Sequence, residues 1–128
     1  MADDTYEAGL AVRRDVLGAD YVDAAIARAD GFSGPFQQWL TENCWGALWT
    51  RKEMSRRDRS LVNVGMLCAL NRGEELKLHL RGALNNGVTV EEIREVMLQV
   101  SVYCGFPAAV TGMRIASEVI AEQGVPQP

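Results

Sequence analysis

The sequence has 128 residues, of which 48% are hydrophobic and 23% charged, with a net charge of −4 and a pI near 5.0. These values are ordinary for one globular domain over residues 1–128, and they lack the excess of basic residues found in most nucleic-acid-binding proteins. The amino terminus is acidic and lacks the apolar core of a signal peptide, and the longest apolar stretches are too short to cross a bilayer. We therefore expect a cytoplasmic protein without nucleic-acid or membrane partners.

The amino-terminal part of the chain is predicted to be helical, because no segment alternates between apolar and polar residues as a strand would. The first helix should begin near Asp4, with Glu7 as its capping-box partner, and end before Gly18. A short second helix is predicted over residues 21–30. The third should cover residues 35–49, opened by its proline.

The next two helices are predicted from capping signals and apolar content. Ser55 and Asp58 should cap the helix SRRDRSLVNVGMLCALNRG. Over residues 61–70 this helix is apolar on almost every side, which indicates burial within the domain or in a subunit interface. Gly73 separates it from a further helix, which should end at residues 86–87, Asn-Gly.

The last two helices begin at clear signals. Thr89 and Glu92 should cap TVEEIREVMLQVSVYCG, and Pro107 should open a final helix that runs to Gly124. The chain is thus predicted to be an all-α bundle of six or seven helices with short connections. The central helices are too apolar for a monomer of this size, so we expect a symmetric homo-oligomer.

The sequence contains one histidine, His79, on the helix that follows Gly73. Glu75 shares its helical face, and Arg72 would lie two turns before it if the helix began that early. A histidine beside a carboxylate can exchange protons near neutral pH, and an arginine can bind a carboxylate substrate. This combination suits acid–base chemistry on a small anion. From spacing alone, a surface Glu–His pair of little energetic consequence is the more common explanation.

The segment WGALWTRKEMSRRDRS places Trp45 and Trp49 among several arginines. Such groups could line a pocket for an unsaturated acid, but tryptophans as core anchors and arginines in solvent are the favoured interpretation for most of them. Arg59 differs, because it immediately precedes the apolar helix and its charge is harder to leave in water. No second histidine or cysteine stands at ligand spacing near His79, so no metal site is expected.

The three cysteines are odd in number, far apart and without a CxxC pair: Cys44, Cys68 and Cys104. This arrangement argues against a disulfide framework. We expect free thiols that contribute to packing, and we do not expect a nucleophile at Cys104.

From about Tyr6 to Glu122 the chain resembles the carboxymuconolactone decarboxylase family. The resemblance is carried by AGLAVRRDVLG, by WGALWTR and by the segment from RRDRSLVNVGML to YCGFPAA. The long segment indicates the superfamily, and the two shorter ones indicate its γ-carboxymuconolactone decarboxylase branch. The implied fold is an AhpD-like helical bundle that assembles into trimers or hexamers. The chain departs from the usual pattern of these decarboxylases at Asn63 and Gly65, which bears on the substrate more than on the fold.

The same superfamily includes AhpD-like peroxidases with a C-x-x-C-x-x-x-H motif. His79 matches the histidine of that motif, while Arg72 and Glu75 occupy the cysteine positions, so the dithiol route is closed. The resemblance implies cofactor-independent decarboxylation of 4-carboxymuconolactone to β-ketoadipate enol-lactone in protocatechuate catabolism, a carboxy-lyase reaction. It implies His79 as proton donor or oxyanion partner, Glu75 as its orienting carboxylate and Arg72 as carboxylate clamp. Weaker candidates for pocket lining are Arg59, Arg81, Trp45 and Trp49.

Two alternatives stay open at this point. The chain could be a superfamily paralogue of unknown substrate that handles peroxide, or a non-catalytic protein that binds a small acid.

Overall fold

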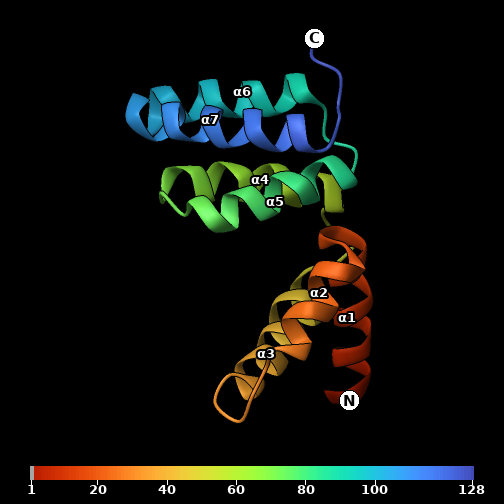
Figure 1. Ribbon diagram of the computed structural model, residues 1–128. Coiled ribbons are helices and arrows are strands. Elements are labelled where there is room, and N and C mark those ends of the chain that lie inside the picture. Colours follow the sequence, from red (N-terminus) through yellow and green to blue (C-terminus); the bar gives the residue numbers. More distant parts are fainter. Residues whose placement is uncertain (1) are drawn as a thin grey trace. The chain divides into compact units, whose positions relative to one another are not determined.

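The computed structural model describes residues 2–128, with side chains from residue 4 onward. Throughout this range the secondary structure is helical and no strand occurs, which confirms the predicted all-α class (Figure 1). Contacts divide the chain into two compact units, Met1–Ser55 and Arg56–Pro128. The expectation of one domain over residues 1–128 stays a prediction. None of the described helices is long and apolar enough to span a membrane.

The first unit contains α1 (Ala2–Leu17), α2 (Ala19–Ala27), α3 (Gly34–Leu40) and the π-helix η1 (Thr41–Leu48). The first helix ends before Gly18 as predicted, and that glycine has a φ of 94°. Its predicted start is wrong: the helix begins at Ala2, so Asp4 lies within the first turn instead of capping it. A carboxylate in that turn still favours the helix dipole.

Two further predicted boundaries in this unit are wrong. The second helix ends at Ala27 and not at residue 30, because the carboxylate of Asp30 accepts hydrogen bonds from the backbone N–H groups of Phe32 and Ser33 and forms a turn. The third helix changes into a π-helix after Leu40, with wider i→i+5 bonds such as that from Trp49 N to Cys44 O.

The backbones of α1 and η1 approach closely at two glycines. A Cβ atom on Gly9 would lie 2.2 Å from the carbonyl oxygen of Thr41, and one on Gly46 would lie 2.5 Å from that of Thr5. Beside this crossing, the buried Arg13 donates from Nη1 to Thr41 Oγ1 at 3.1 Å and to the Gln37 side chain at 3.0 Å. The glycines and Arg13 together join α1 to η1.

The second unit contains α4 (Arg56–Ala69), α5 (Gly73–Asn85), α6 (Val90–Tyr103) and α7 (Phe106–Glu122). Figure 1 shows α6 and α7 side by side as one layer, packed on the layer formed by α4 and α5. The predicted capping box of α6 is confirmed: Glu92 N donates to Thr89 Oγ1, and Thr89 N donates to the Glu92 carboxylate. The predicted stop of α5 is also confirmed, since Gly87 has a φ of 90°.

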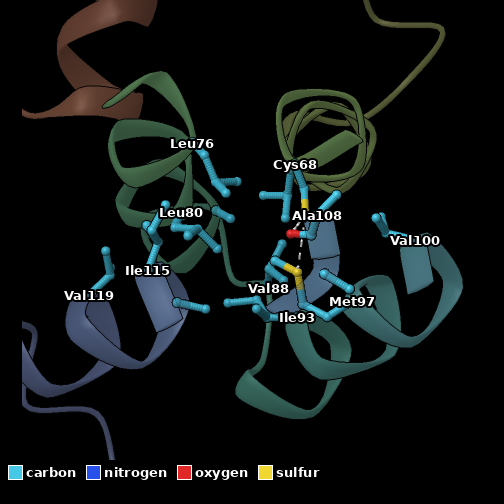
Figure 2. Close-up of a cluster of buried hydrophobic side chains, with 14 residues drawn as sticks. Cys68, Leu76, Leu80, Val88, Ile93, Met97, Val100, Ala108, Ile115 and Val119 are labelled. Carbon is cyan, nitrogen blue, oxygen red and sulfur yellow. Dashed lines mark hydrogen bonds between the residues drawn. The ribbon is translucent and has the colours of Figure 1, made fainter. Parts of the chain in front are cut away.

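The core of the second unit lies between these two layers. Figure 2 shows side chains from all four helices converging there, with Cys68 of α4 pointing toward Met97 of α6 and Ala108 of α7. Cys68 Sγ lies 3.6 Å from Met97 Sδ and 3.4 Å from the carbonyl oxygen of Ala108. Gly112 of α7 faces the same sulfurs, because an added Cβ would lie 2.5 Å from Cys68 Sγ and 2.7 Å from Met97 Sδ.

The helix predicted to be buried on almost every side is not buried all round within one chain. Val64 and Cys68 of α4 are buried, but Val62, Met66 and Leu70 are 47%, 49% and 65% exposed. These three residues are four apart and form one stripe. A second set of largely exposed apolar residues surrounds the turn between α6 and α7: Val102, Tyr103, Phe106 and Val110.

Candidate functional site

His79 lies in the middle of α5 and is half-buried. Its ring faces α4, where Asn63 Nδ2 lies 3.5 Å from His79 Nδ1. At the C-cap of α5, Asn86 donates from Nδ2 to Oγ of the buried Ser60 on α4 at 2.9 Å. This hydrogen bond supports the same register of the two helices. The Asn63–His79 and Ser60–Asn86 pairs form a polar seam between α4 and α5, which we call the α4–α5 seam.

The electrostatic environment of His79 favours a neutral ring. Burial lowers the pKa of His79 below its usual 6.5, and the Glu75 carboxylate, one turn earlier on α5, opposes this with a smaller effect. The predicted influence of Glu75 therefore has the expected direction, but burial outweighs it. Glu75 itself is exposed. At pH 7 the imidazole is thus expected to be uncharged.

Arg59 lies on α4 one turn before Asn63, so the two side chains share a helical face. It is half-buried, and its Nε is buried with no hydrogen-bond partner among the residues that the structure describes. Leaving a charged N–H group unpaired in the interior is costly. Arg59 is therefore suited to receive an anion beside the α4–α5 seam.

Arg72 lies at the start of α5, which begins at Gly73, and as the N-cap it has non-helical backbone angles, φ −95° and ψ 74°. The preceding Asn71, with a φ of 59°, turns the chain there. Arg72 borders a cavity of about 120 Å³ whose other lining residues include Thr111 and Arg114 of α7. Neither His79 nor Glu75 lines that cavity.

The remaining predicted site residues all have partners. Arg81 lies two residues after His79, on another side of α5, where its Nη2 pairs with Glu122 at 2.9 Å. In the first unit, Trp45 and Trp49 are each 3% exposed, and their rings stack with centroids 4.9 Å apart. That arrangement agrees with the core-anchor interpretation of the two tryptophans.

The cysteines carry free thiols in different environments. Burial raises the pKa of the Cys68 and Cys44 thiols, which keeps them protonated and poorly nucleophilic. Cys104 is exposed at the C-cap of α6. Within residues 2–128, no three histidine, cysteine, aspartate or glutamate side chains are grouped so that they could hold a metal ion.

Asn63 is the site residue that the sequence did not single out as functional. The available signal was a polar residue inside the apolar run LVNVGML, since a buried amide must find a hydrogen-bond partner. That signal identifies Asn63 as unusual but does not identify its partner.

Comparison with known proteins covers most of the chain. The model of the carboxymuconolactone decarboxylase family matches residues 34–118, which include the α4–α5 seam. A 4-carboxymuconolactone decarboxylase of Acinetobacter baylyi is 40% identical over 120 residues, covering 94% of this chain and 90% of the relative. A nitrosuccinic acid decarboxylase of Metarhizium robertsii is 43% identical over 115 residues, covering 90% of this chain and 80% of the relative.

Proposed function

The chain belongs to the carboxymuconolactone decarboxylase family, and from this premise we propose that it is a carboxy-lyase acting on 4-carboxymuconolactone without a metal or organic cofactor. Both relatives above are named for decarboxylation, although of different acids. Decarboxylation is therefore their common step, and the lactone is the substrate that we propose for this chain.

The proposed substrate can supply its own electron sink. The bond from the ring carbon to the departing carboxylate breaks, and CO2 leaves without the bonding electron pair. This pair moves through the ring double bond to the lactone carbonyl, whose oxygen becomes an oxyanion. A proton then returns to a ring carbon and gives the enol-lactone of β-ketoadipate. The protein must bind carboxylates, stabilise the oxyanion and allow protonation.

The observation that carries the proposal is the α4–α5 seam, where a half-buried histidine contacts Asn63. One turn before Asn63 on α4, the buried Nε of Arg59 has no hydrogen-bond partner among the described residues. We propose that His79 bonds the lactone oxygen and that Arg59 binds a substrate carboxylate. Glu75 orients His79 and moderates its pKa. The substrate has a second carboxylate, for which we propose Arg72. Support for direct substrate contact is weakest for Arg81, Trp45 and Trp49, which already have partners.

The test is CO2 release from enzymatically generated 4-carboxymuconolactone, with nitrosuccinate as the competing substrate. We expect turnover of the lactone and a fall in kcat of about 100-fold or more for His79→Ala, the usual scale for losing one hydrogen-bond donor to an oxyanion. Arg59→Gln should raise KM more than it lowers kcat, since a carboxylate clamp binds ground and transition states alike. Arg94→Gln, an exposed arginine of α6, is the matched control.

Three outcomes would contradict the proposal. Faster turnover of nitrosuccinate would reject the lactone as substrate, and binding of the lactone without CO2 release would indicate a binding protein. Unchanged kinetics for a folded His79→Ala protein would reject the site.

We also propose that the chain forms a homo-oligomer of at least three subunits. The support is the exposed apolar stripe of Val62, Met66 and Leu70 together with the exposed apolar residues at the α6–α7 turn. Contiguous apolar surface of this kind usually marks an interface. Light scattering at micromolar concentration tests this, and a monomer mass of 14.1 kDa would reject it.

A further inference from the structure

We propose that Asn63 is a positioning residue for His79, whose amide holds the imidazole as the tautomer protonated on Nε2, so that His79 acts on the substrate as a neutral hydrogen-bond donor. The role toward substrate rests on the proposed function. The tautomer does not, because it follows from the contact between two side chains of the α4–α5 seam.

The contact between Asn63 and His79 joins two nitrogen atoms. Asn63 Nδ2 lies 3.5 Å from His79 Nδ1, and an amide nitrogen can only donate a hydrogen bond. Nδ1 must therefore accept, and a neutral imidazole that accepts on Nδ1 carries its proton on Nε2. An imidazolium would direct a second N–H group at the amide N–H. The contact thus favours one tautomer and disfavours the charged ring.

Both side chains are held by packed helices. Val64 follows Asn63 and is fully buried, and Leu80 follows His79 and is fully buried as well. The Ser60–Asn86 hydrogen bond is a second polar contact between the two segments and favours the same register of α4 against α5. Because the two backbones are fixed in this way, the amide is a preorganised partner of the ring.

Charged groups that bear on His79 lie on α5 itself and on α4 and α7, the helices that pack against it. On α5 itself, Glu75 raises the pKa of His79, but less than burial lowers it. On α4, Arg59 lies one turn before Asn63 and is the cationic residue on that face of the helix. On α7, Glu122 is already paired with Lys77 and Arg81. The surroundings therefore agree with the neutral ring that the Asn63 contact requires.

This assignment changes what His79 can do in the proposed reaction. A neutral imidazole is a very weak proton donor, because loss of its only N–H proton would leave an imidazolate. It is nevertheless a good hydrogen-bond donor to an oxyanion formed in the same site. His79 then stabilises the lactone oxyanion, and the proton that reaches the ring carbon comes from water. The rate should consequently not fall as pH rises above the pKa of His79.

The test uses the fact that His79 is the only histidine of the chain. Imidazole ¹⁵N NMR of the labelled full-length protein therefore reports one ring without assignment. At pH 7.5 we expect a protonated Nε2 and an unprotonated Nδ1. Asn63→Asp should raise the pKa of His79 by about one unit or more, because a carboxylate stabilises the imidazolium. Asn63→Leu should give a mixture of tautomers.

The control is Asn43→Leu, which removes an amide that donates to the carbonyl oxygen of Trp39 in the first unit. It should leave the His79 spectrum unchanged. In turnover assays, Asn63→Leu should lower kcat by about 10-fold, equivalent to 1.36 kcal/mol. The kcat of the parent should stay level from pH 7 to pH 8.5, a range chosen to lie above the usual histidine pKa of about 6.5.

A protonated Nδ1 in the parent protein, or an unchanged ring spectrum in Asn63→Leu, would overturn the tautomer assignment. A kcat that falls as the NMR-detected imidazolium is lost would overturn the neutral-donor role and make His79 the proton donor. Absence of any CO2 release by the parent would reject the proposed function instead, while the NMR result would still decide the tautomer.

Discussion

Substitution of Gly112 by alanine gives a sharp test of the packing in the second unit. The new methyl group would lie 2.5 Å from Cys68 Sγ and 2.7 Å from Met97 Sδ, well inside van der Waals contact. Alanine in a helix is favoured over glycine by about 1 kcal/mol. Overpacking of a core costs about 1–3 kcal/mol. Because both sulfurs belong to buried residues, we expect an overpacking cost in the upper part of this range, about 2–3 kcal/mol. After subtraction of the helical gain, the net loss should be about 1–2 kcal/mol.

The assay is urea unfolding followed by far-ultraviolet circular dichroism at a fixed protein concentration, since oligomerisation makes stability concentration-dependent. The control is Gly65→Ala on α4, where the nearest atom to the new methyl would be Val96 Cγ1 at 3.7 Å, an ordinary contact. That variant should be as stable as the parent or more stable.

A double-mutant cycle isolates the clash. In a Cys68→Ala background the sulfur is gone, so Gly112→Ala should cost at least about 1 kcal/mol less than in the parent, within the usual range of coupling between contacting residues. If Gly112→Ala alone stabilised the protein as Gly65→Ala does, the description of this part of the core would be refuted.

Three further outcomes are expected. Thr89→Ala removes the oxygen that accepts from Glu92 N and should lower the free energy of unfolding by about 1 kcal/mol; an unchanged urea midpoint would contradict the capping role. Burial lowers the pKa of His79 below 6.5, so as pH falls below 6.5 the unfolded chain binds this proton first and the folded state loses stability. His79→Gln should therefore reduce the fall of the melting temperature with pH below 6.5. The same fall in the parent and in His79→Gln would contradict this. The double substitution of Cys68 and Cys104 by serine should cost stability but preserve CO2 release, and near-total loss of turnover in a folded protein would show that the thiols take part in the chemistry.

The sequence predicted those elements whose signals are local. The Thr89–Glu92 capping box and the glycine stop after α5 depend on residues a few positions apart, and both were found as predicted. The change from α3 to a π-helix was missed, because it occurs where η1 crosses α1 at Gly9 and Gly46, which are far apart in sequence. A helical pattern in residues 35–49 contains no sign of that crossing.

The candidate site was predicted in part for the same reason. The spacing of Glu75 and His79 gave the direction of one influence on the imidazole pKa, but burial, the larger influence, depends on the packing of α5 against α4. Asn63 and His79 meet only because two antiparallel helices have a particular register. The expected position of Arg72 two turns before His79 depended on where the helix begins, and α5 begins at Gly73, just after Asn71 in the left-handed region and the N-cap Arg72.

The crossing of α1 and η1 restricts how the first unit can change shape. Many proteins accommodate ligands by shear, in which packed helices slide past each other by small amounts. Sliding α1 by one turn would bring Thr5 or Arg13, which share its helical face, to the place of Gly9, where there is room for a hydrogen atom and none for a methyl group. A shift of α1 by a full turn along η1 is therefore sterically blocked at this point, and larger movements of the two helices should occur together.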